Sequence, residues 1–600
     1  MPGGALPVLG EYDVVVVGGG TGGAPTGIAA GRQGAKTLVL EYLYGLGGVG
    51  TLGMIGHYWY GNICGFTAEH DKGVAELNAA VHVVGKSEWW RRENRRAGTE
   101  IWFGAMGCGT LTEGGRVTGV VVATPGGRGV VLAKSVVDAT GNSDIAASAG
   151  AETVFLGAEE FAVQGAGLSL RKLGASYINS DFSYVNDSDA ADLWLFGVRG
   201  RAGAKNSWDI SQIVETRERQ RIVGDAWVTP LDILNERTFP DTIVRARSNF
   251  DSHGYSVADI TYVSEPVAPK DGRLICEANI PYRALLPKGV EGLAVIGLGI
   301  SAHRDAMPIM RMQPDIQNMG YAAGVAAAAA ARDGKTFRTI DVKALQRHLA
   351  DKGNIPPDAP EWKDNAVVPP ERLAMAVKGM GDRYRDVSLV LAQADAAMPL
   401  LRQAYDTETR VSAKLVYAHV LGILGDATGA QTLLDAVSGK VPLQDLGTGG
   451  EKAFGRRMSD LDSYIVALGR TRDRRALEPL LAKVAELGVG SSSTRFRSLT
   501  LALEALGDPA AAQPLAELLR KPGIGGHALG DPRQAPPEEG IYGKGSAERY
   551  QVLRELAVAR ALVRCGDFEG VGERTLKAYA ADPRGIYAVH AAEVLKKGKQ

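Results

Sequence analysis

Residues 12–41, YDVVVVGGGTGGAPTGIAAGRQGAKTLVLE, have the pattern of a strand, a tight turn, a helix and a second strand. Residues 14–17 are four consecutive valines, which is typical of a strand buried on both faces. Gly18, Gly20 and Gly23 then give the GxGxxG spacing that brings a helix N-terminus against a diphosphate. Glu41 ends the second strand about twenty residues later, where a carboxylate can accept hydrogen bonds from ribose hydroxyls. This segment predicts a dinucleotide-binding βαβ unit.

The length and charge of the chain limit the number of domains and the classes of partner that it can bind. A chain of 600 residues is too long for one hydrophobic core, which predicts roughly two to four domains. The formal net charge of −1 gives no basic surplus of the kind that binding of nucleic acid requires. No apolar run approaches the ~18 residues of a membrane span, and no signal peptide is visible. A cytoplasmic location is therefore the default expectation, with export left open if a leader has been trimmed.

The cysteines argue against a metal site or a disulfide framework. The four residues Cys64, Cys108, Cys276 and Cys565 are scattered, and no CxxC spacing occurs. We therefore expect no bound metal and a reducing compartment.

Three later segments favour FAD over NAD. Residues 44–62, YGLGGVGTLGMIGHYWYGN, form a second glycine-rich stretch, which suits an extended cofactor lying along the chain. Residues 114–146 have the pattern of a β-meander followed by a buried strand, SVVDATG. The strand GLAVIGL at 292–298 precedes the polar segment SAHRDAMPIMRMQPDIQNMG and an alanine-rich helix, whose small residues suit tight packing on a sheet.

Together these segments resemble the FAD-dependent oxidoreductase family with the glutathione-reductase-type fold, which is distantly similar to the flavoproteins of fumarate reductase and succinate dehydrogenase. The resemblance extends over roughly residues 10–335. It implies that the fingerprint glycines and Glu41 hold the ADP half of FAD, and that residues 138–141 pass beside the cofactor. The cofactor-binding residues implied in this way are Gly18, Gly20, Thr21, Gly22, Gly23, Glu41, Gly47, Gly48, Ala139, Thr140, Gly141, Gln313, Asp315, Gln317 and Asn318.

The last of these segments ends at a predicted helix start. Gln313 is expected to cap the helix, with Pro314 at its first position. The helix N-terminus carries about half a positive charge, which would stabilise anionic reduced flavin. The His-Thr segment that attaches FAD covalently in succinate dehydrogenase flavoproteins is absent, which predicts noncovalent FAD. The arginine-centred acid relay of fumarate reductases is not recognisable, which argues against a dicarboxylate substrate.

The catalytic prediction centres on His303, which follows a strand expected to contact the flavin. A neutral imidazole there can accept an alcohol proton while hydride passes to flavin N5. Arg304 and Arg311 are candidates for binding a carboxylate or hydroxyl groups, or for raising the flavin's potential. Asp305 is a candidate for orienting His303 or pairing with an arginine.

The middle of the chain offers further polar residues. Asp251, His253 and Tyr255 could reach into a cleft, although a single histidine is more often structural. A run of charged residues in the same region most simply predicts a solvated or interdomain salt network. Its members are Glu215, Arg217, Glu218, Arg219 and Arg221.

The last third has a different pattern. Residues 424–437, 468–484 and 506–519 each combine Leu-Gly, a short turn and an amphipathic helix. This arrangement resembles HEAT-like repeats, in which each helical pair buries its face on the next.

The expected fold is α/β: a Rossmann-like FAD-binding domain with an inserted α+β substrate domain, followed by an all-α HEAT-like solenoid. The expected boundaries are 10–155 and 275–335 for the FAD-binding domain, 156–274 for the substrate domain, 336–384 for a linker and 385–600 for the solenoid.

The leading functional hypothesis is an FAD-dependent oxidoreductase that transfers hydride from a hydroxylated small molecule, such as a carbohydrate, to flavin N5. One alternative is a fumarate-reductase-like enzyme that reduces a C=C bond. The other is a repeat scaffold in which FAD is structural or sensory. The electron acceptor, whether oxygen, quinone or protein, stays open, and the helical repeats are a candidate surface for a protein partner.

Overall fold

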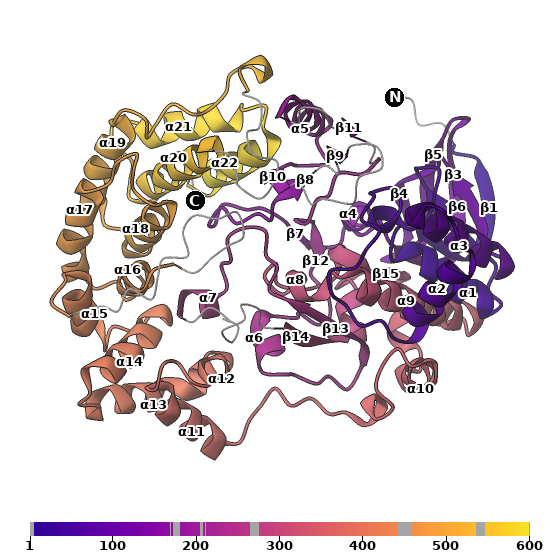
Figure 1. Cartoon of the computed structure of the whole chain (residues 1–600), viewed down its shortest axis with the longest axis horizontal. Coiled ribbons are helices and arrows are strands. Elements are labelled where there is room, and N and C mark those ends of the chain that lie inside the picture. Colours follow the sequence, from indigo (N-terminus) through magenta and orange to yellow (C-terminus); the bar gives the residue numbers. More distant parts are fainter. Residues whose placement is uncertain are drawn as a thin grey trace.

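A seven-stranded sheet forms the centre of the N-terminal half of the protein in this computed structural model (Figure 1). The structure describes residues 5–167, 170–171, 181–203, 208–209, 212–263, 275–441, 458–535 and 547–598. Neighbouring strands follow the order β3-β2-β1-β6-β5-β4, and β15 pairs with the C-terminal end of β6. The strands are β1 (Val8–Val17), β2 (Thr37–Glu41), β3 (Glu100–Phe103), β4 (Met106–Glu113), β5 (Arg116–Thr124), β6 (Gly127–Asp138) and β15 (Leu293–Val295).

The predicted βαβ unit is confirmed by β1, α1 (Gly23–Arg32) and β2, with β1 and β2 parallel. Val14, Val15 and Val16 have no solvent exposure, as expected of a strand covered on both faces. α1 packs against α9 (Gln313–Arg332), the alanine-rich helix. A Cβ at Gly320 would lie 2.0 Å from the carbonyl oxygen of Gly22, so the close approach of these two helices requires small residues.

Two local predictions need correction. The buried strand predicted at SVVDATG is confirmed for residues 135–138, but it is not separate from the meander, because these residues are the end of β6 and continue its parallel ladder with β1. Gln313 does not cap α9, because the N-cap position belongs to Met312 and Gln313 is the first helical residue. The Gln313 side chain instead donates its Nε2 hydrogen to the carbonyl of Ile55 at 2.8 Å. It therefore ties the second glycine-rich stretch to the start of α9.

An insert of short strands and helices lies between the sheet and the C-terminal region (Figure 1). Its longest pairing is antiparallel, between β13 (Thr242–Asn249) and β14 (Ile275–Pro281). Its other elements are β7 (Thr153–Val154), β8 (Ala166–Gly167), β9 (Leu170–Arg171), β10 (Asp181–Ser183), α5 (Ala190–Gly203), β11 (Trp208–Asp209), β12 (Arg221–Ile222), α6 (Pro230–Leu234) and α7 (Asp259–Val263).

Further helices cover the sheet domain. They are α2 (Gly65–Glu76), α3 (His82–Arg96), α4 (Asp144–Ser148) and α10 (Val342–Lys352). The short helix α8 (Met307–Met310) instead packs on β13 and β14 of the insert.

The C-terminal region is mostly helical and curves around the insert (Figure 1). Each of the three expected repeats is the end of one helix, a turn and a second helix. α14, α16, α18 and α20 contact one another in succession and form an inner row, while α15, α17 and α19 pack outside it. Membership of the HEAT family stays a prediction. The helices are α11 (Pro370–Met380), α12 (Val387–Ala392), α13 (Ala394–Thr407), α14 (Val411–Ile423), α15 (Ala430–Val437), α16 (Asp460–Arg470), α17 (Leu477–Ala485), α18 (Ser493–Leu506), α19 (Ala512–Arg520), α20 (Ala547–Arg564), α21 (Val571–Ala580) and α22 (Gly585–Lys597).

The helical region and the insert share one hydrophobic core. Phe161, Tyr262 and Val263 of the insert belong to the same buried cluster as the leucines of the inner row. Three further contacts cross the boundary: Arg560 Nη1 donates to the Glu159 carbonyl (3.0 Å), Arg564 Nη2 donates to the Ala158 carbonyl (2.6 Å), and His590 Nδ1 lies 2.8 Å from the Gly157 carbonyl oxygen. This chain's own insert therefore packs on the inner row of helices.

Arg560→Met is expected to destabilise this shared core by about 2 kcal/mol, because it removes one of the two arginines that pair with the buried Glu504 carboxylate and leaves Arg564 as the other. Arg560 is 1% exposed, and its Nε donates to Glu504 Oε1 at 2.8 Å. Urea unfolding followed by circular dichroism measures the loss. Lys597→Met is the control, because its ion pair with Glu159 is largely solvated and is worth at most ~1 kcal/mol. Equal losses in the two variants would contradict a shared core.

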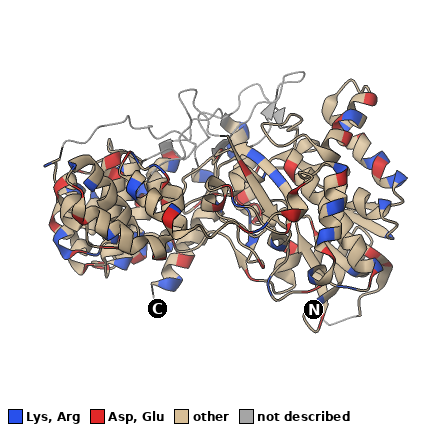
Figure 2. Cartoon of the chain, turned by 90° about the horizontal axis from the view of Figure 1, so that it is seen from below, with Lys and Arg blue, Asp and Glu red and all other residues tan. Residues whose placement is uncertain are grey.

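Charges of both signs are interspersed over the two lobes (Figure 2). Within the described ranges, no helix has the length and apolar character required to cross a bilayer. The described residues also contain no group of three or more histidine, cysteine, aspartate or glutamate side chains arranged to hold a metal ion.

Candidate functional site

A cavity of 1620 Å³ runs along the carboxyl ends of β1 and β2. Ordinary small-molecule sites measure ~300–1,000 Å³, so this cavity has room for a dinucleotide and a second molecule. The sheet domain, the insert and the helical region all line it, the last through Met458 and Arg497. The predicted cofactor residues in its wall are Gly18, Gly20, Thr21, Gly22, Glu41, Gly48, Ala139, Thr140, Gly141 and Gln313.

The three fingerprint glycines have different surroundings. Gly18 has a φ of +96°, a conformation that favours glycine, and a Cβ there would lie 2.6 Å from the Ala139 carbonyl oxygen. A Cβ at Gly23 would lie 1.7 Å from the Gly18 carbonyl oxygen. At Gly20, by contrast, the nearest atom to a Cβ would be the Gly48 Cα at 3.9 Å. The fold itself therefore requires glycine at positions 18 and 23. Gly20 instead leaves open space where a diphosphate would approach.

The two glycine-rich stretches are joined by hydrogen bonds. The Gly47 N–H donates to the Gly19 carbonyl at 2.9 Å, and the Thr21 hydroxyl donates to the Gly47 carbonyl at 3.1 Å. Gly47 thus supports the wall from behind, whereas Gly48 lines the cavity.

Glu41 is held in position by the backbone. Its Oε2 accepts from the Gly19 N–H and its Oε1 from the Leu43 N–H, both at 2.8 Å. Burial raises the pKa of Glu41, against the opposing effect of these N–H donors. Each carboxylate oxygen keeps a second lone pair for a hydroxyl donor, which fits the role implied for a ribose.

Asp138 anchors the turn formed by residues 139–141. It has no solvent exposure, and it accepts hydrogen bonds from the Thr140 hydroxyl at 2.6 Å and from the Ile145 and Ala146 N–H groups at 3.0 Å each. Burial raises the pKa of Asp138 to about 6. Its hydrogen bonds keep the turn against the cavity.

The polar residues of α9 that follow Gln313 form hydrogen bonds with neighbouring segments of the protein. Asp315 accepts from the Asn62 N–H at 2.9 Å and from the Arg247 N–H at 3.1 Å, and burial raises its pKa to about 7. Gln317 lies 3.3 Å from the Tyr58 hydroxyl, and Asn318 accepts from the Thr67 N–H at 3.1 Å. The described residues that line the cavity do not include Asp315, Gln317, Asn318 or Gly23.

A second polar group lies in the wall where β13 ends. His253 Nε2 is 2.7 Å from Asp251 Oδ2, and Arg311 Nη2 donates to the Asp251 carbonyl at 2.8 Å. All three residues line the cavity. Burial would raise the pKa of Asp251, but the hydrogen bond to His253 and the charges of Arg311 and Arg217 outweigh it and hold that pKa well below its usual range. Asp251 is therefore an ionised carboxylate beside an imidazole.

The backbone of His253 is unusual. Its φ is +49°, which is uncommon for a residue other than glycine and often marks a functional site. The His253 carbonyl accepts from the Gly165 N–H at 2.6 Å, which helps to fix this conformation.

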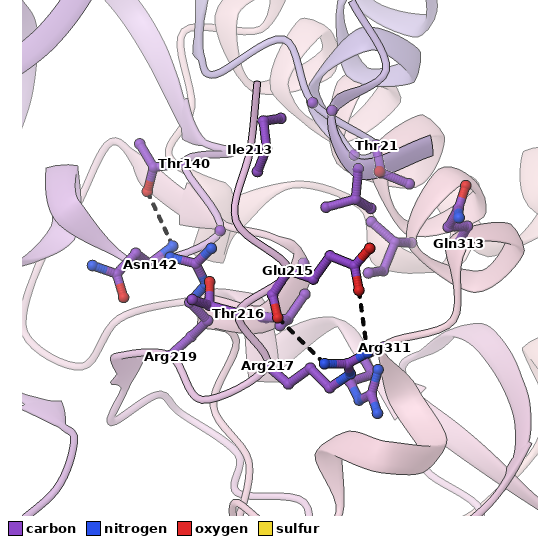
Figure 3. Close-up of a pocket in the computed structure, with 18 of the residues that line it drawn as sticks. Thr21, Thr140, Asn142, Ile213, Glu215, Thr216, Arg217, Arg219, Arg311 and Gln313 are labelled. Carbon is purple, nitrogen blue, oxygen red and sulfur yellow. Dashed lines mark hydrogen bonds and ion pairs between the residues drawn. The ribbon is translucent and has the colours of Figure 1, made fainter. Parts of the chain in front are cut away.

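The charged run of the insert divides into two parts. Glu215, Arg217 and Arg219 line the cavity, where Glu215, Arg217 and Arg311 group together (Figure 3). Glu218 and Arg221 instead form a buried ion pair at 3.1 Å. Glu215 also pairs with Arg217, and Arg219 pairs with Asp187, so the whole run belongs to a salt network, as the sequence interpretation expected. Three of its members line the cavity as well.

His303, Arg304 and Asp305 mainly join the polar segment to the insert. Arg304 Nη2 donates to Glu218 Oε2 at 3.1 Å, and Asp305 Oδ2 accepts from the backbone N–H groups of Val257 and Ala258. His303 Nδ1 accepts from the Asp305 N–H at 3.1 Å, and burial lowers its pKa. Of these three, only Asp305 is among the described residues of the cavity wall.

The comparisons with known proteins agree with this geometry. The sequence profile of the family "FAD dependent oxidoreductase" matches residues 13–194 and 198–349, more than half of the chain. No curated protein matches the chain.

Three solved structures show weak likeness. A geranylgeranyl bacteriochlorophyll reductase-like protein from Thermoplasma acidophilum is 14% identical, covering 66% of this chain and 99% of its own, with a TM-score of 0.29. A 3-ketosteroid-delta4-(5alpha)-dehydrogenase from Rhodococcus jostii is 14% identical, covering 54% and 97%, with a TM-score of 0.28. A flavocytochrome c3 fumarate reductase is 14% identical, covering 54% and 79%, with a TM-score of 0.26. These likenesses are too low to bear on substrate or mechanism. The family match and the fingerprint geometry together establish that this chain belongs to the FAD-dependent oxidoreductase family.

Proposed function

We propose that this protein oxidises a hydroxylated small molecule, with FAD held noncovalently in the 1620 Å³ cavity. The observation that carries the proposal is the His253–Asp251 pair, 2.7 Å apart, in the wall of the same cavity as the dinucleotide fingerprint. A histidine held by an ionised carboxylate is an arrangement suited to accepting the proton of an alcohol.

The residues present fit FAD. Gly20 leaves space for a diphosphate, Glu41 offers acceptors to a ribose, and α1 and α9 direct their N-termini toward the cavity. When bound, FAD supplies the acceptor for a hydride. Release of the flavin into solution by acid would support noncovalent binding, and flavin that stays with the precipitated protein would contradict it.

His253 is the proposed base. It would take the hydroxyl proton as the substrate's C–H bond gives up its hydride, so the alcohol becomes a carbonyl and two electrons leave the substrate. Asp251 would orient the imidazole and stabilise its charged form. Arg311, fixed by the Asp251 carbonyl, would bind a substrate oxygen. His303, the base expected from the sequence, stays the competing assignment.

The helical region is proposed to complete the substrate cavity rather than to serve as a separate scaffold. Its inner row packs on the insert, and its residues Met458 and Arg497 line the cavity. This arrangement supports an enzyme with a helical wall over a scaffold that carries a structural flavin.

An anaerobic substrate panel tests the proposal. Sugars and simple alcohols are mixed with the oxidised protein without oxygen, and the loss of the visible flavin absorbance is followed. A true donor should reduce the flavin at roughly 1 s⁻¹ or faster. Bleaching by at least one alcohol is the expected result. No bleaching by alcohols, combined with reoxidation of dithionite-reduced protein by enoates, would instead favour a C=C reductase. A protein that binds no flavin even after reconstitution would refute both enzyme hypotheses.

A further inference from the structure

A buried lysine lies directly behind the cavity wall. Lys86 belongs to α3 and is 1% exposed. Its Nζ lies 3.4 Å from the Gly56 carbonyl oxygen and 3.4 Å from Gln313 Oε1. A Cβ at Gly50 would also lie 3.4 Å from this Nζ. Because Gln313 lines the cavity, a single side chain separates the ammonium group from the cofactor space.

The surroundings of Lys86 compensate its charge only in part. Its Nζ lies 4.5 Å from the centroid of the Tyr58 ring, a cation–π contact. The negative charge of Asp71 on α2 favours the ammonium form, but this carboxylate accepts from the Tyr58 hydroxyl at 2.7 Å and lies 2.8 Å from His70 Nδ1. The other titratable groups in the surroundings of Lys86 are His70 on α2, His57 in the loop before α2 and His82 on α3 itself.

We propose that Lys86 raises the two-electron reduction potential of the flavin bound in this cavity. It makes no contact with a substrate in this role and acts through its field alone. The inference goes beyond the proposed alcohol oxidation, because it holds for any two-electron donor. It rests on the proposed binding of FAD in the cavity, with the flavin ring at the Gln313 end.

Electrostatics gives the direction in which Lys86 shifts the reduction potential. Two-electron reduction makes a flavin more negative, and a cation in a low-dielectric interior stabilises that form more than the oxidised form. The N-terminus of α9, which begins at Gln313, adds partial positive charge on the same side. Lys86 and α9 therefore favour the reduced cofactor together.

Lys86→Met is the direct test, because it keeps the length of the side chain and removes the charge. We expect the equilibrium constant for reduction to fall at least tenfold, which is about 30 mV for a two-electron couple. The potential is measured by equilibration with a reference dye under anaerobic conditions, near pH 6.5. Lys72→Met, at an exposed lysine on α2, is the matched control and should leave the potential unchanged.

The pH dependence separates a charge effect from a structural one. Burial lowers the pKa of Lys86 to about 8, against the opposing effect of Asp71. The ammonium is thus present below that pH and lost above it. The difference between the wild type and Lys86→Met should therefore be largest at about pH 6.5 and shrink at about pH 9.5. Lys86→Arg, which stays charged, should keep a higher potential than the wild type at the alkaline pH.

The outcomes are distinct. A Lys86→Met variant that retains FAD with the wild-type potential near pH 6.5 would overturn the inference. So would a difference of equal size at both pH values, because that result indicates altered packing. If Lys86→Met loses FAD, the comparison of Lys86→Arg with the wild type at both pH values decides instead. A wild-type protein that binds no FAD would refute the proposed function and this inference together, whereas bound FAD with an unchanged potential in Lys86→Met would refute the inference alone.

Discussion

Gly23→Ala is expected to abolish FAD binding, with a loss of affinity of at least 100-fold. The added Cβ would lie 1.7 Å from the Gly18 carbonyl oxygen, so the backbone of the turn must move. Forced overpacking of this kind typically costs ~1–3 kcal/mol or more, and it displaces the helix N-terminus that the diphosphate requires. Titration of deflavinated protein with FAD measures the affinity, and urea unfolding of the same sample measures the stability.

Gly20→Ala is the informative counterpart. Its Cβ meets nothing nearer than 3.9 Å, so the unfolding free energy of the deflavinated protein should change by less than ~0.5 kcal/mol. FAD affinity should still fall about tenfold or more, because the methyl group occupies space left for the diphosphate. Gly488→Ala, where no atom lies within 4 Å, is the control for both quantities. Unchanged FAD affinity in Gly20→Ala would mean that the dinucleotide does not bind at this turn.

The parts of the fold that could be predicted are those whose physics is local. The four valines, the fingerprint glycines and Glu41 act within thirty residues of one another, and β1, α1 and β2 appear where they were expected. The helical pairs were predictable for the same reason, because leucine spacing and turns are local. Two details could not be predicted locally: that residues 135–138 belong to β6, and which residue caps α9. The first depends on the pairing of β6 with β1, and the second on the contact of Gln313 with Ile55, so both depend on partners distant in sequence.

The substrate side of the site was the least predictable part. His303 follows a strand of the sheet, which is a local signal for an active-site residue, yet its Nδ1 accepts from the Asp305 backbone at 3.1 Å. Asp251 and His253 lie in the insert and reach the cavity only through the pairing of β13 with β14. The available signal was an Asp-x-His pair, which is weak by itself. Met458 and Arg497 come from the helical region and had no local signal, because only tertiary packing brings them to the cavity.

His253→Asn is expected to slow the reduction of the flavin by an identified alcohol donor by ~10²–10⁴-fold, the usual contribution of a general base. Asparagine is the chosen replacement because His253 has a φ of +49°, and asparagine tolerates the left-handed region better than other uncharged residues of similar size. Anaerobic stopped-flow absorbance at saturating donor gives the rate directly. FAD content should stay the same, because neither the fingerprint loop nor α9 is altered.

Two companion variants decide between the histidines. Asp251→Asn should also slow reduction, by a smaller factor. It should do so throughout the neutral range, because the pKa of Asp251 is held below its usual value and the carboxylate is therefore ionised there. His303→Asn should leave the rate within about threefold of the wild type, since a residue outside the cavity wall takes no proton from the substrate. If His303→Asn lowers the rate by more than tenfold while His253→Asn does not, the base is the histidine expected from the sequence, and the role of the Asp251–His253 pair is structural.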